Sequence, residues 1–316
     1  MAAMKRREFL ARSIAGAGSL MLGARLPAAE SRPAGRYEPY EMVSLGQTNI
    51  KLTRIGIGTG MRGGNRQSNH TRLGQERFNA LVLGAYERGV RWFDLADLYG
   101  THPYLANALT QIPRKDYVLV SKIWWRRGGI PEPERPDADV VVDRFLKELR
   151  TDYLDLILLH CVVSEQWPSE LSRQMEILAR LKKKGIVRAH GVSCHALGAL
   201  QACIEEPWVD SVHARINPYG ASMDGPAEQV APVLRQIHDA GKAVVGMKLI
   251  GEGRFRDSDE MRDSSVRYAL ESGCVDTMVV GFEKTEEIDD FAARVRKVET
   301  RGVSARARRP HPVGVA

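Results

Sequence analysis

Polar side chains that can move a proton lie at the ends of several apolar runs in this 316-residue chain. Asp94 ends one run, and Tyr99 lies in the segment beyond it. Lys122 and His160 end the next two runs. A carboxylate, a phenol, an ammonium group and an imidazole can together transfer a proton and stabilise a developing charge. Each residue taken singly also has a purely structural interpretation. Asp94 could be a helix cap, Tyr99 a loop aromatic, Lys122 a solvated charge and His160 a core histidine.

Eight apolar runs of strand length must position these side chains. Between Met42 and Gly58, two alternating segments flank the turn-rich Gly46-Gln47-Thr48-Asn49, which predicts a β-hairpin followed by a first strand ending at Gly58. Seven further buried strands are expected at Arg91–Asp94, Tyr117–Ser121, Leu154–Leu159, Ala189–Val192, Ser211–Ile216, Ala243–Met247 and Thr277–Val280.

Segments with helical periodicity separate the strands, for example Asp143–Leu149 and Leu178–Lys182. Eight strand-helix units predict an α/β fold, a (β/α)8 TIM barrel with the hairpin at its bottom. A doubly wound sheet is the alternative, but no G-x-G-x-x-G follows the first strand, and Gly56–Gly60 lacks a helix start. In a barrel the carboxyl ends of the strands meet at one face, so the polar side chains would converge there.

In order and strand position, these residues resemble the catalytic tetrad of the aldo-keto reductase family. The segments that carry the resemblance are Phe93–Gly100, Ser121–Lys122 and Leu158–His160, with the run Gly56–Gly60 ahead of them, and it extends from about Val43 to Val298. The resemblance implies an NAD(P)(H)-dependent oxidoreductase. Such an enzyme reduces an aldehyde or ketone, or oxidises the corresponding alcohol or sugar.

The tetrad implies a division of labour between four side chains. Reducing a carbonyl requires a hydride at carbon and a proton for the developing alkoxide, and Tyr99 would supply the proton as general acid/base. The positive charge of Lys122 is expected to lower the pKa of Tyr99. Asp94 would hold that ammonium in place, and His160 would donate a hydrogen bond that orients and polarises the carbonyl.

The resemblance also assigns a dinucleotide site to the strand ends. The nicotinamide carboxamide is expected near Ser193, Cys194 and His213, where the family has a Ser-Asn pair and a glutamine; Cys194 is a poor donor and acceptor. After the seventh strand, a glycine loop with one lysine would approach the pyrophosphate. The other expected cofactor contacts are Gly58, Thr59, Asp94, Lys248, Leu249, Gly251 and Gly253.

The segment after the last strand bears on the choice between NAD and NADP. Glu283, Lys284 and Glu287 occupy the place that meets the adenosine 2′-phosphate in relatives. A carboxylate repels a phosphate but accepts a hydrogen bond from a ribose hydroxyl, so Glu283 favours NAD. Lys284 works in the other direction, because a lysine there can meet the phosphate.

Trp124 and Trp125 follow Lys122 and are expected to line a pocket for an apolar or sugar-like carbonyl compound, with core filling as the alternative.

Two other functions stay open. Altered carboxamide contacts suggest a noncatalytic nucleotide-binding barrel. A metal-dependent barrel hydrolase would use ligands at strand ends, but it leaves Tyr99 and Lys122 unexplained. Its candidate ligands are Asp94, His160, Cys194, His195 and His213.

Composition narrows the range of partners. Of the net charge of +7, residues 1–29 carry +4 and residues 300–316 carry +4, which leaves −1 for the body of the chain. A near-neutral body lacks the clustered basic face that grips nucleic acid, so nucleic acid is excluded as a partner. The four cysteines form no C-x-x-C pair, so no metal module is expected.

The N-terminus resembles a twin-arginine signal. Lys5-Arg6-Arg7-Glu8-Phe9-Leu10 precedes a small, weakly apolar stretch that is too short to span a bilayer permanently. Residues 1–29 are therefore interpreted as an export signal that directs the protein to the periplasm, with a basic tail as the alternative. Residues 30–41 would be a linker, 42–299 the barrel, and 300–316 a disordered basic tail.

Overall fold

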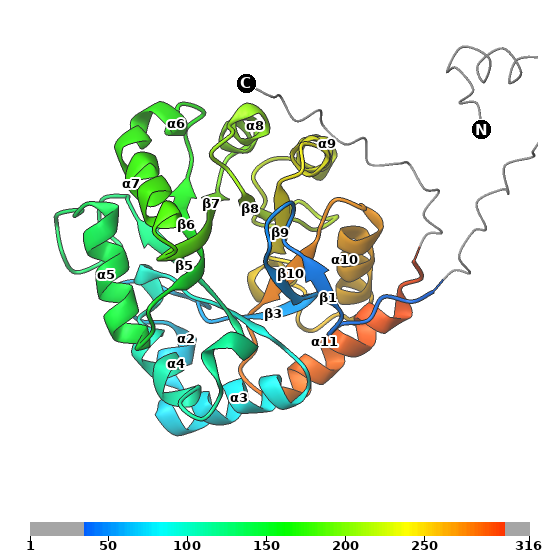
Figure 1. Cartoon of the computed structure of the whole chain (residues 1–316). Coiled ribbons are helices and arrows are strands. Elements are labelled where there is room, and N and C mark those ends of the chain that lie inside the picture. Colours follow the sequence, from blue (N-terminus) through cyan, green and yellow to red (C-terminus); the bar gives the residue numbers. More distant parts are fainter. Residues whose placement is uncertain (1–34, 301–316) are drawn as a thin grey trace, which may run out of the picture. The chain divides into compact units, whose positions relative to one another are not determined.

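The eight predicted barrel strands form a closed parallel barrel in the computed structural model, which describes residues 35–300 (Figure 1). The strands follow one another around the barrel in chain order, and β10 closes the ring against β3. Their bounds are β3 Ile55–Gly58, β4 Trp92–Asp94, β5 Val118–Trp124, β6 Leu154–Val162, β7 Val187–Cys194, β8 Ser211–Arg215, β9 Ala243–Met247 and β10 Thr277–Val280. The TIM-barrel prediction is confirmed.

Three central strands are longer than the sequence pattern predicted. In β5 and β6 the pairing continues beyond the apolar run, with Lys122 opposite Leu158 and Trp124 opposite His160. Lys122 and His160 therefore lie inside strands and not at their ends. Polar residues on the inner face interrupt the apolar run while the backbone ladder continues, so periodicity ends each strand too early.

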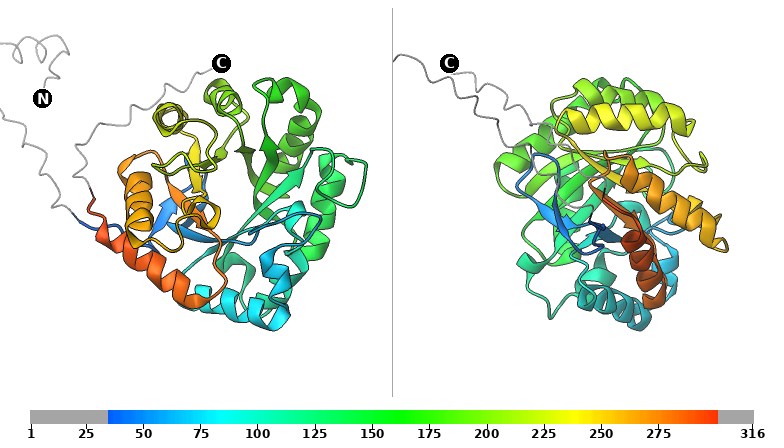
Figure 2. Two further views of the ribbon diagram at one scale, coloured as in Figure 1. Left: turned by 180° about the vertical axis from the view of Figure 1, so that it is seen from behind. Right: turned by 90° about the vertical axis from the view of Figure 1, so that its right-hand side faces the viewer.

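Helices surround the barrel on all sides (Figure 2). Their bounds are α2 Asn69–Arg72, α3 Gln75–Glu87, α4 His102–Ala108, α5 Ala138–Leu149, α6 Trp167–Glu170, α7 Ser172–Lys183, α8 Leu197–Glu205, α9 Ala227–Asp239, α10 Asp259–Glu271 and α11 Thr285–Lys297. Three short 3-10 turns join them: η1 Asp97–Tyr99, η2 Arg114–Asp116 and η3 Gly251–Gly253. Among the described residues, no helix has the length and apolar character needed to cross a membrane.

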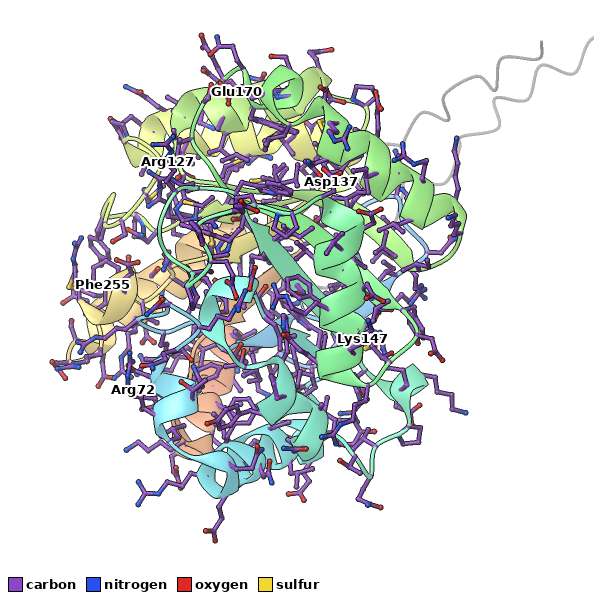
Figure 3. All side chains as sticks on the ribbon, turned by 90° about the vertical axis from the view of Figure 1, so that its left-hand side faces the viewer. Arg72, Arg127, Asp137, Lys147, Glu170 and Phe255 are labelled. Atoms are coloured by element: carbon purple, nitrogen blue, oxygen red, sulfur yellow. The ribbon has the colours of Figure 1, made fainter. Side chains whose placement is uncertain are left out.

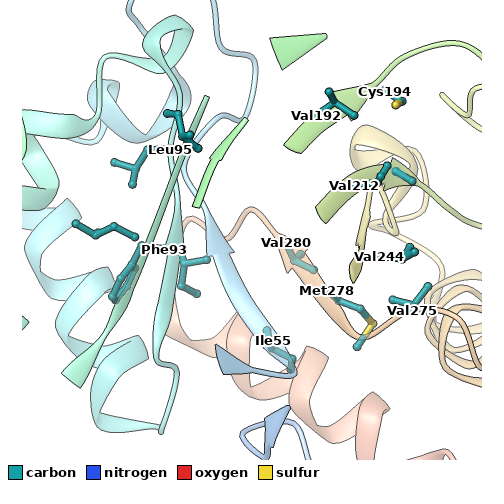
Figure 4. Close-up of a cluster of buried hydrophobic side chains, with 14 of the residues drawn as sticks. Ile55, Phe93, Leu95, Val192, Cys194, Val212, Val244, Val275, Met278 and Val280 are labelled. Carbon is teal, nitrogen blue, oxygen red and sulfur yellow. The ribbon is translucent and has the colours of Figure 1, made fainter. Parts of the chain in front are cut away.

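Side chains alternate along each strand between two apolar layers. The outer layer fills the space between strands and helices, and Val192 and Cys194 of β7 belong to it together with Val212 of β8 (Figure 4). The inner layer lies inside the barrel and includes Trp92 and Leu156. Polar side chains of the site therefore have to come from the inward-facing set.

A hairpin lies at the amino-terminal end of the barrel, as predicted. Strands β1 (Met42–Ser44) and β2 (Lys51–Thr53) pair antiparallel. The turn between them reaches the start of β9, where the Gln47 amide donates to the Gly241 carbonyl at 3.1 Å. Fully buried Leu45 joins the inner layer. This packing leaves the opposite end of the barrel for the site.

The barrel unit begins earlier than the predicted boundary at Met42. Residues 35–41, expected as linker, belong to the same compact unit as the barrel. Arg36 forms a bridge with Glu299, and the Tyr37 hydroxyl donates to the Leu270 carbonyl at 3.2 Å. The predicted signal at 1–29 lies outside the described residues, as do 30–34 and 301–316.

Gly56 provides a test of the inner packing. A Cβ at this position would lie 1.9 Å from Cε2 of Trp92, whose indole Nε1 donates to the Thr53 carbonyl at 2.8 Å. We expect Gly56→Ala to lower the free energy of unfolding by about 3 kcal/mol, measured by guanidinium denaturation. Gly64→Ala is the control, because its Cβ would meet nothing within 4 Å. Equal losses in the two variants would contradict the packing.

Candidate active site

A buried ion pair lies at the centre of the barrel mouth. Lys122 Nζ lies 2.6 and 2.5 Å from the two carboxylate oxygens of Asp94 and donates to the Leu95 carbonyl at 3.0 Å. The two residues are only 2% and 4% exposed. Burial alone would raise the pKa of Asp94, but the neighbouring Lys122 ammonium and His213 ring hold it below its ordinary value. The carboxylate is therefore ionised, and its charge offsets that of Lys122.

Thr59 and Gly58 support this pair from the first barrel strand. Gly58 pairs with Asp94 in the β3–β4 ladder. The Thr59 hydroxyl donates to the Asp94 carbonyl at 2.9 Å and lies 2.7 Å from the hydroxyl of Thr101. Both threonines are completely buried. The two predicted cofactor residues thus fix the backbone that carries Asp94.

His213, which is expected to meet the nicotinamide carboxamide, lies beside the buried ion pair. Its Nε2 lies 3.3 Å from a carboxylate oxygen of Asp94. The ring is completely buried and meets Trp92 edge to face. The position of His213 along β8 predicted which face of the strand it occupies. It did not predict that the ring would lie beside the buried Asp94 carboxylate.

Tyr99 is fixed by close contacts with two glycines. A Cβ on Gly60 would lie 2.3 Å from Cζ of the Tyr99 ring, and one on Gly63 would lie 2.7 Å from its Cδ1. The β3–α2 segment therefore packs its bare backbone against the ring face. In the sequence, Gly60 is recognisable only as part of the Gly56–Gly60 run.

Ion pairs hold the turn that carries Tyr99. Asp97, almost completely buried, accepts from Arg66 at 2.9 Å and lies 2.8 Å from a guanidinium nitrogen of Arg144. Gly100 continues the turn with φ of 68°, and a Cβ there would meet the Arg66 carbonyl oxygen at 1.9 Å. These supports leave no local pattern in the sequence, because their partners lie far apart in the chain.

Tyr99, His160 and Trp124 meet above the ion pair. The Tyr99 hydroxyl lies 3.5 Å from His160 Nε2, and the two rings meet edge to face. The Trp124 ring packs edge-on against His160, with centroids 5.3 Å apart. Lys122 Nζ lies 5.2 Å from the centroid of the Tyr99 ring. The fold therefore brings the four predicted tetrad residues together.

The expected effect of Lys122 on Tyr99 is not found. Burial, followed by the nearby Asp94 and Cys161, raises the pKa of Tyr99 well above that of a free phenol. Lys122 cannot counter this rise because its ammonium is taken up by Asp94. Burial, followed by the charge of Lys122, lowers the pKa of His160 well below its ordinary value. Both the phenol and the imidazole are therefore uncharged near neutral pH.

The residues that end β7 have different surroundings. The Ser193 hydroxyl, inside the barrel, accepts from the Cys161 amide at 3.0 Å and keeps its own proton to donate. The Cys194 side chain lies in the outer core, with its Sγ 3.6 Å from that of Cys203 on α8. This placement does not support the expected contact between the Cys194 thiol and the carboxamide. Alternation along the strand turns the thiol away from the barrel interior.

The loop after β9 has the left-handed backbone that its glycines allow. Lys248, Gly251 and Gly253 all have positive φ, at 61°, 55° and 91°. Lys248 Nζ lies 2.7 Å from Glu252 of the same loop, while Leu249 is buried. The Gly251 and Gly253 amides donate to the Lys248 and Ile250 carbonyls, both at 2.9 Å, so these two amides are used within the loop.

At the start of α11, the predicted acidic residues are engaged with neighbours. Asn69 donates to the Glu283 carboxylate at 2.9 Å, and the Glu283 amide donates to Glu287 at 2.8 Å. Lys284 precedes the first residue of the helix and is exposed. The segment thus presents one carboxylate and one ammonium at the same rim.

Of the two predicted pocket tryptophans, Trp124 alone adjoins the tetrad. Trp125 packs against the outer core. The proposed metal ligands do not converge, since Cys194 faces the helices. Within residues 35–300 no three His, Cys, Asp or Glu side chains are grouped so that they could hold a metal ion.

Comparison with known proteins decides the family. A sequence profile of the aldo/keto reductase family matches residues 54–266, more than half of the chain. The chain belongs to the aldo/keto reductase family. The predicted class of activity, a nicotinamide-dependent oxidoreductase that acts on carbonyl compounds, is thereby confirmed for this aldo/keto reductase.

Individual relatives are distant. The chain is 22% identical over 304 residues to the uncharacterized oxidoreductase YqkF of Bacillus subtilis, covering 83% of this chain and 94% of that protein. It is 28% identical over 158 residues to methylglyoxal reductase DkgB of Salmonella typhimurium, covering 47% of this chain and 55%, about half, of that protein. An aldo-keto reductase from Klebsiella pneumoniae solved in complex with NADPH has a TM-score of 0.61, 19% identity, and coverage of 82% of this chain and 90% of that chain. At such identity, this likeness shows the fold.

The ion pair of this aldo/keto reductase can be tested through stability. Lys122→Met leaves the buried Asp94 carboxylate without its main partner, so we expect a loss of about 3 to 5 kcal/mol in the free energy of unfolding. Lys147→Met on α5 is the control, because that lysine is 75% exposed and its pair with Asp143 is worth little (Figure 3). Denaturant unfolding of both variants gives the comparison, and similar losses would contradict a buried pair.

Proposed function

We propose that Tyr99 is the proton donor of this aldo/keto reductase in the reduction of a small aldehyde or ketone. The observation that carries the proposal is the meeting of the Tyr99 hydroxyl and His160 Nε2, 3.5 Å apart, above the buried Asp94–Lys122 pair. A carbonyl oxygen that accepts hydrogen bonds from both groups would be placed for protonation.

The protonation states support this direction of transfer. Since burial raises the pKa of Tyr99, the phenol holds its proton until a developing alkoxide takes it. Neutral His160 can donate one N–H bond to the same oxygen, polarising the carbonyl without competing for the proton. Lys122, fixed by Asp94, lies 5.2 Å from the centroid of the ring.

The residues present fit a nicotinamide dinucleotide on the other half of the barrel mouth. When bound, the nicotinamide supplies the hydride to the carbonyl carbon. Ser193 has a free hydroxyl proton for the carboxamide, and the glycine loop that carries Lys248 would lie against the pyrophosphate. A Cβ on Gly253 would meet no atom within 4 Å, so this backbone is open to a ligand.

We propose a preference for NAD over NADP. Glu283 would repel a 2′-phosphate and accept from a ribose hydroxyl, although neighbouring Lys284 has the opposite charge. Dissociation constants of the two cofactors, measured by fluorescence titration, decide the question. A tighter NADP complex would refute the preference.

We also propose export through the twin-arginine pathway, which moves folded proteins and suits a barrel that acquires its cofactor before transport. Support comes from Arg6-Arg7 ahead of Phe9 and Leu10. A reporter fused to the signal should lose export when Arg6 and Arg7 are both changed to Lys. Unchanged export would overturn the proposal.

Removing the Tyr99 hydroxyl tests the proton donor. We expect Tyr99→Phe to lower kcat for reduction of a small dicarbonyl such as methylglyoxal by about 10³-fold or more, with cofactor affinity within about twofold of wild type. Tyr104→Phe on α4 is the control, since its ring packs edge to face on Phe78 of the outer core, and the change should leave kcat unchanged. Full turnover by Tyr99→Phe would contradict the mechanism, and absence of turnover in wild type would favour a noncatalytic barrel.

The pH dependence should differ between the two directions of reaction. Reduction needs the protonated phenol, and its pKa lies above the ordinary range, so the rate should stay flat between about pH 6 and 9. Alcohol oxidation needs the phenolate, so its rate should rise about tenfold per pH unit over the same range. Steady-state rates in both directions measure this. A reductive rate that falls by half near pH 8 would be inconsistent with the raised pKa.

A further inference from the structure

An arginine outside the tetrad lies on the substrate half of the barrel mouth. Lys122, Trp124 and Arg126 are alternate residues, and side chains alternate in direction along a strand such as β5, which ends at Trp124. Their exposure increases in that order, from buried Lys122 through partly exposed Trp124 to exposed Arg126. These three side chains lead from the reaction centre to the rim.

A contact with Cys161 places the Arg126 side chain close to the tetrad. Its Nη1 lies 3.5 Å from the Sγ of Cys161, the residue that follows His160. Cys161 has φ of 63°, and the pairing of β6 with β7 shifts register between Leu159 and Val162. The guanidinium therefore lies beside the strand end that carries His160, across the mouth from the predicted pyrophosphate loop.

Three other cations of the mouth have carboxylate partners, whereas Arg126 has none. Lys122 pairs with Asp94. The pairs Arg215–Asp224 and Lys248–Glu252 each have a nitrogen-oxygen distance of 2.7 Å. Throughout residues 35–300, no carboxylate lies within 4.0 Å of the Arg126 guanidinium.

His195 lies among several positive charges, of which Arg126 is one. Burial, followed by the charges of Arg215, Lys248 and Arg126, lowers the pKa of His195 to about 3. His195 is thus neutral and can donate an N–H bond near the guanidinium. An entering anion would meet a positive potential without displacing a protein carboxylate.

The backbone that carries Arg126 is held in place. Arg135 donates to the Arg126 carbonyl at 3.0 and 2.6 Å and to the Gly128 carbonyl at 2.8 Å. The Trp124 indole donates to the same Gly128 carbonyl at 2.6 Å. The loop is therefore positioned before any ligand arrives, which reduces the entropy lost on binding.

We propose that Arg126 binds a carboxylate of the substrate, so that the enzyme prefers carbonyl compounds that carry a carboxylate a few atoms from the reacting carbon. The inference rests on the proposed function of the Tyr99 site and names its substrate class. One guanidinium matches one carboxylate in charge and in its paired donors.

A matched pair of aldehydes tests the preference. 4-Carboxybenzaldehyde carries the anion, and methyl 4-formylbenzoate has nearly the same shape without the charge; both rings can pack on Trp124. We expect the wild-type enzyme to have the lower KM for the carboxylate. Arg126→Gln should raise the KM for the carboxylate about tenfold and change the KM for the ester by no more than about twofold. Arg127→Gln removes the same charge from the next residue of the loop and should change neither KM (Figure 3).

Calorimetric titration of the full chain with 4-carboxybenzaldehyde, without reductant, separates this inference from the proposed function. The site is supported if wild type and Arg127→Gln bind the aldehyde and Arg126→Gln binds it about tenfold more weakly. This holds even if neither aldehyde is reduced. If both enzymes reduce both aldehydes, and Arg126→Gln has the same KM for the carboxylate as wild type, the role of Arg126 is overturned. The Tyr99 mechanism would still stand. Absence of binding by wild type, or equal weakening in both variants, would also overturn the role of Arg126.

Discussion

The buried pair of Asp94 and Lys122 is the constraint on which the rest of the site depends. Two charges can remain inside the barrel only if each is compensated and its remaining hydrogen-bonding capacity is filled. The Leu95 carbonyl receives the third contact of the ammonium, and His213 lies against the carboxylate. These contacts compensate both charges inside the barrel.

Neutralising Lys122 also determines the chemistry of Tyr99. An unpaired ammonium beside the phenol would stabilise the phenolate, whereas an ammonium bound to a carboxylate leaves burial as the dominant effect on the phenol. Close packing against Gly60 and Gly63 prevents the ring from moving toward solvent. Tyr99 is therefore held as a neutral donor next to neutral His160, in an arrangement suited to protonating a reduced carbonyl.

The barrel was predictable from local signals, and the tetrad from its resemblance to the aldo-keto reductase pattern. Strands β9 and β10 have the predicted bounds, since each is a continuous apolar run buried on both faces. The predicted ends of β5 and β6 were wrong, because inward-facing Lys122 and His160 interrupt the apolar runs of these strands. The surroundings of Cys194 and His213 depend on neighbours distant in sequence, Cys203 on α8 and Asp94 on β4. Arg126 has a local signal, its alternation with Lys122 and Trp124, but only the structure shows that it lacks a carboxylate.

The central claim is that Tyr99 remains protonated because Asp94 takes up the charge of Lys122. The most direct measurement is a pH titration by NMR of protein labelled with ¹³C at tyrosine Cζ, with Tyr99→Phe used to assign the resonance. The account predicts no ionisation of Tyr99 up to about pH 10, and a lower pKa in Asp94→Asn, where the ammonium is no longer paired with a carboxylate. Ionisation of Tyr99 near pH 8 in the wild-type protein would contradict the account.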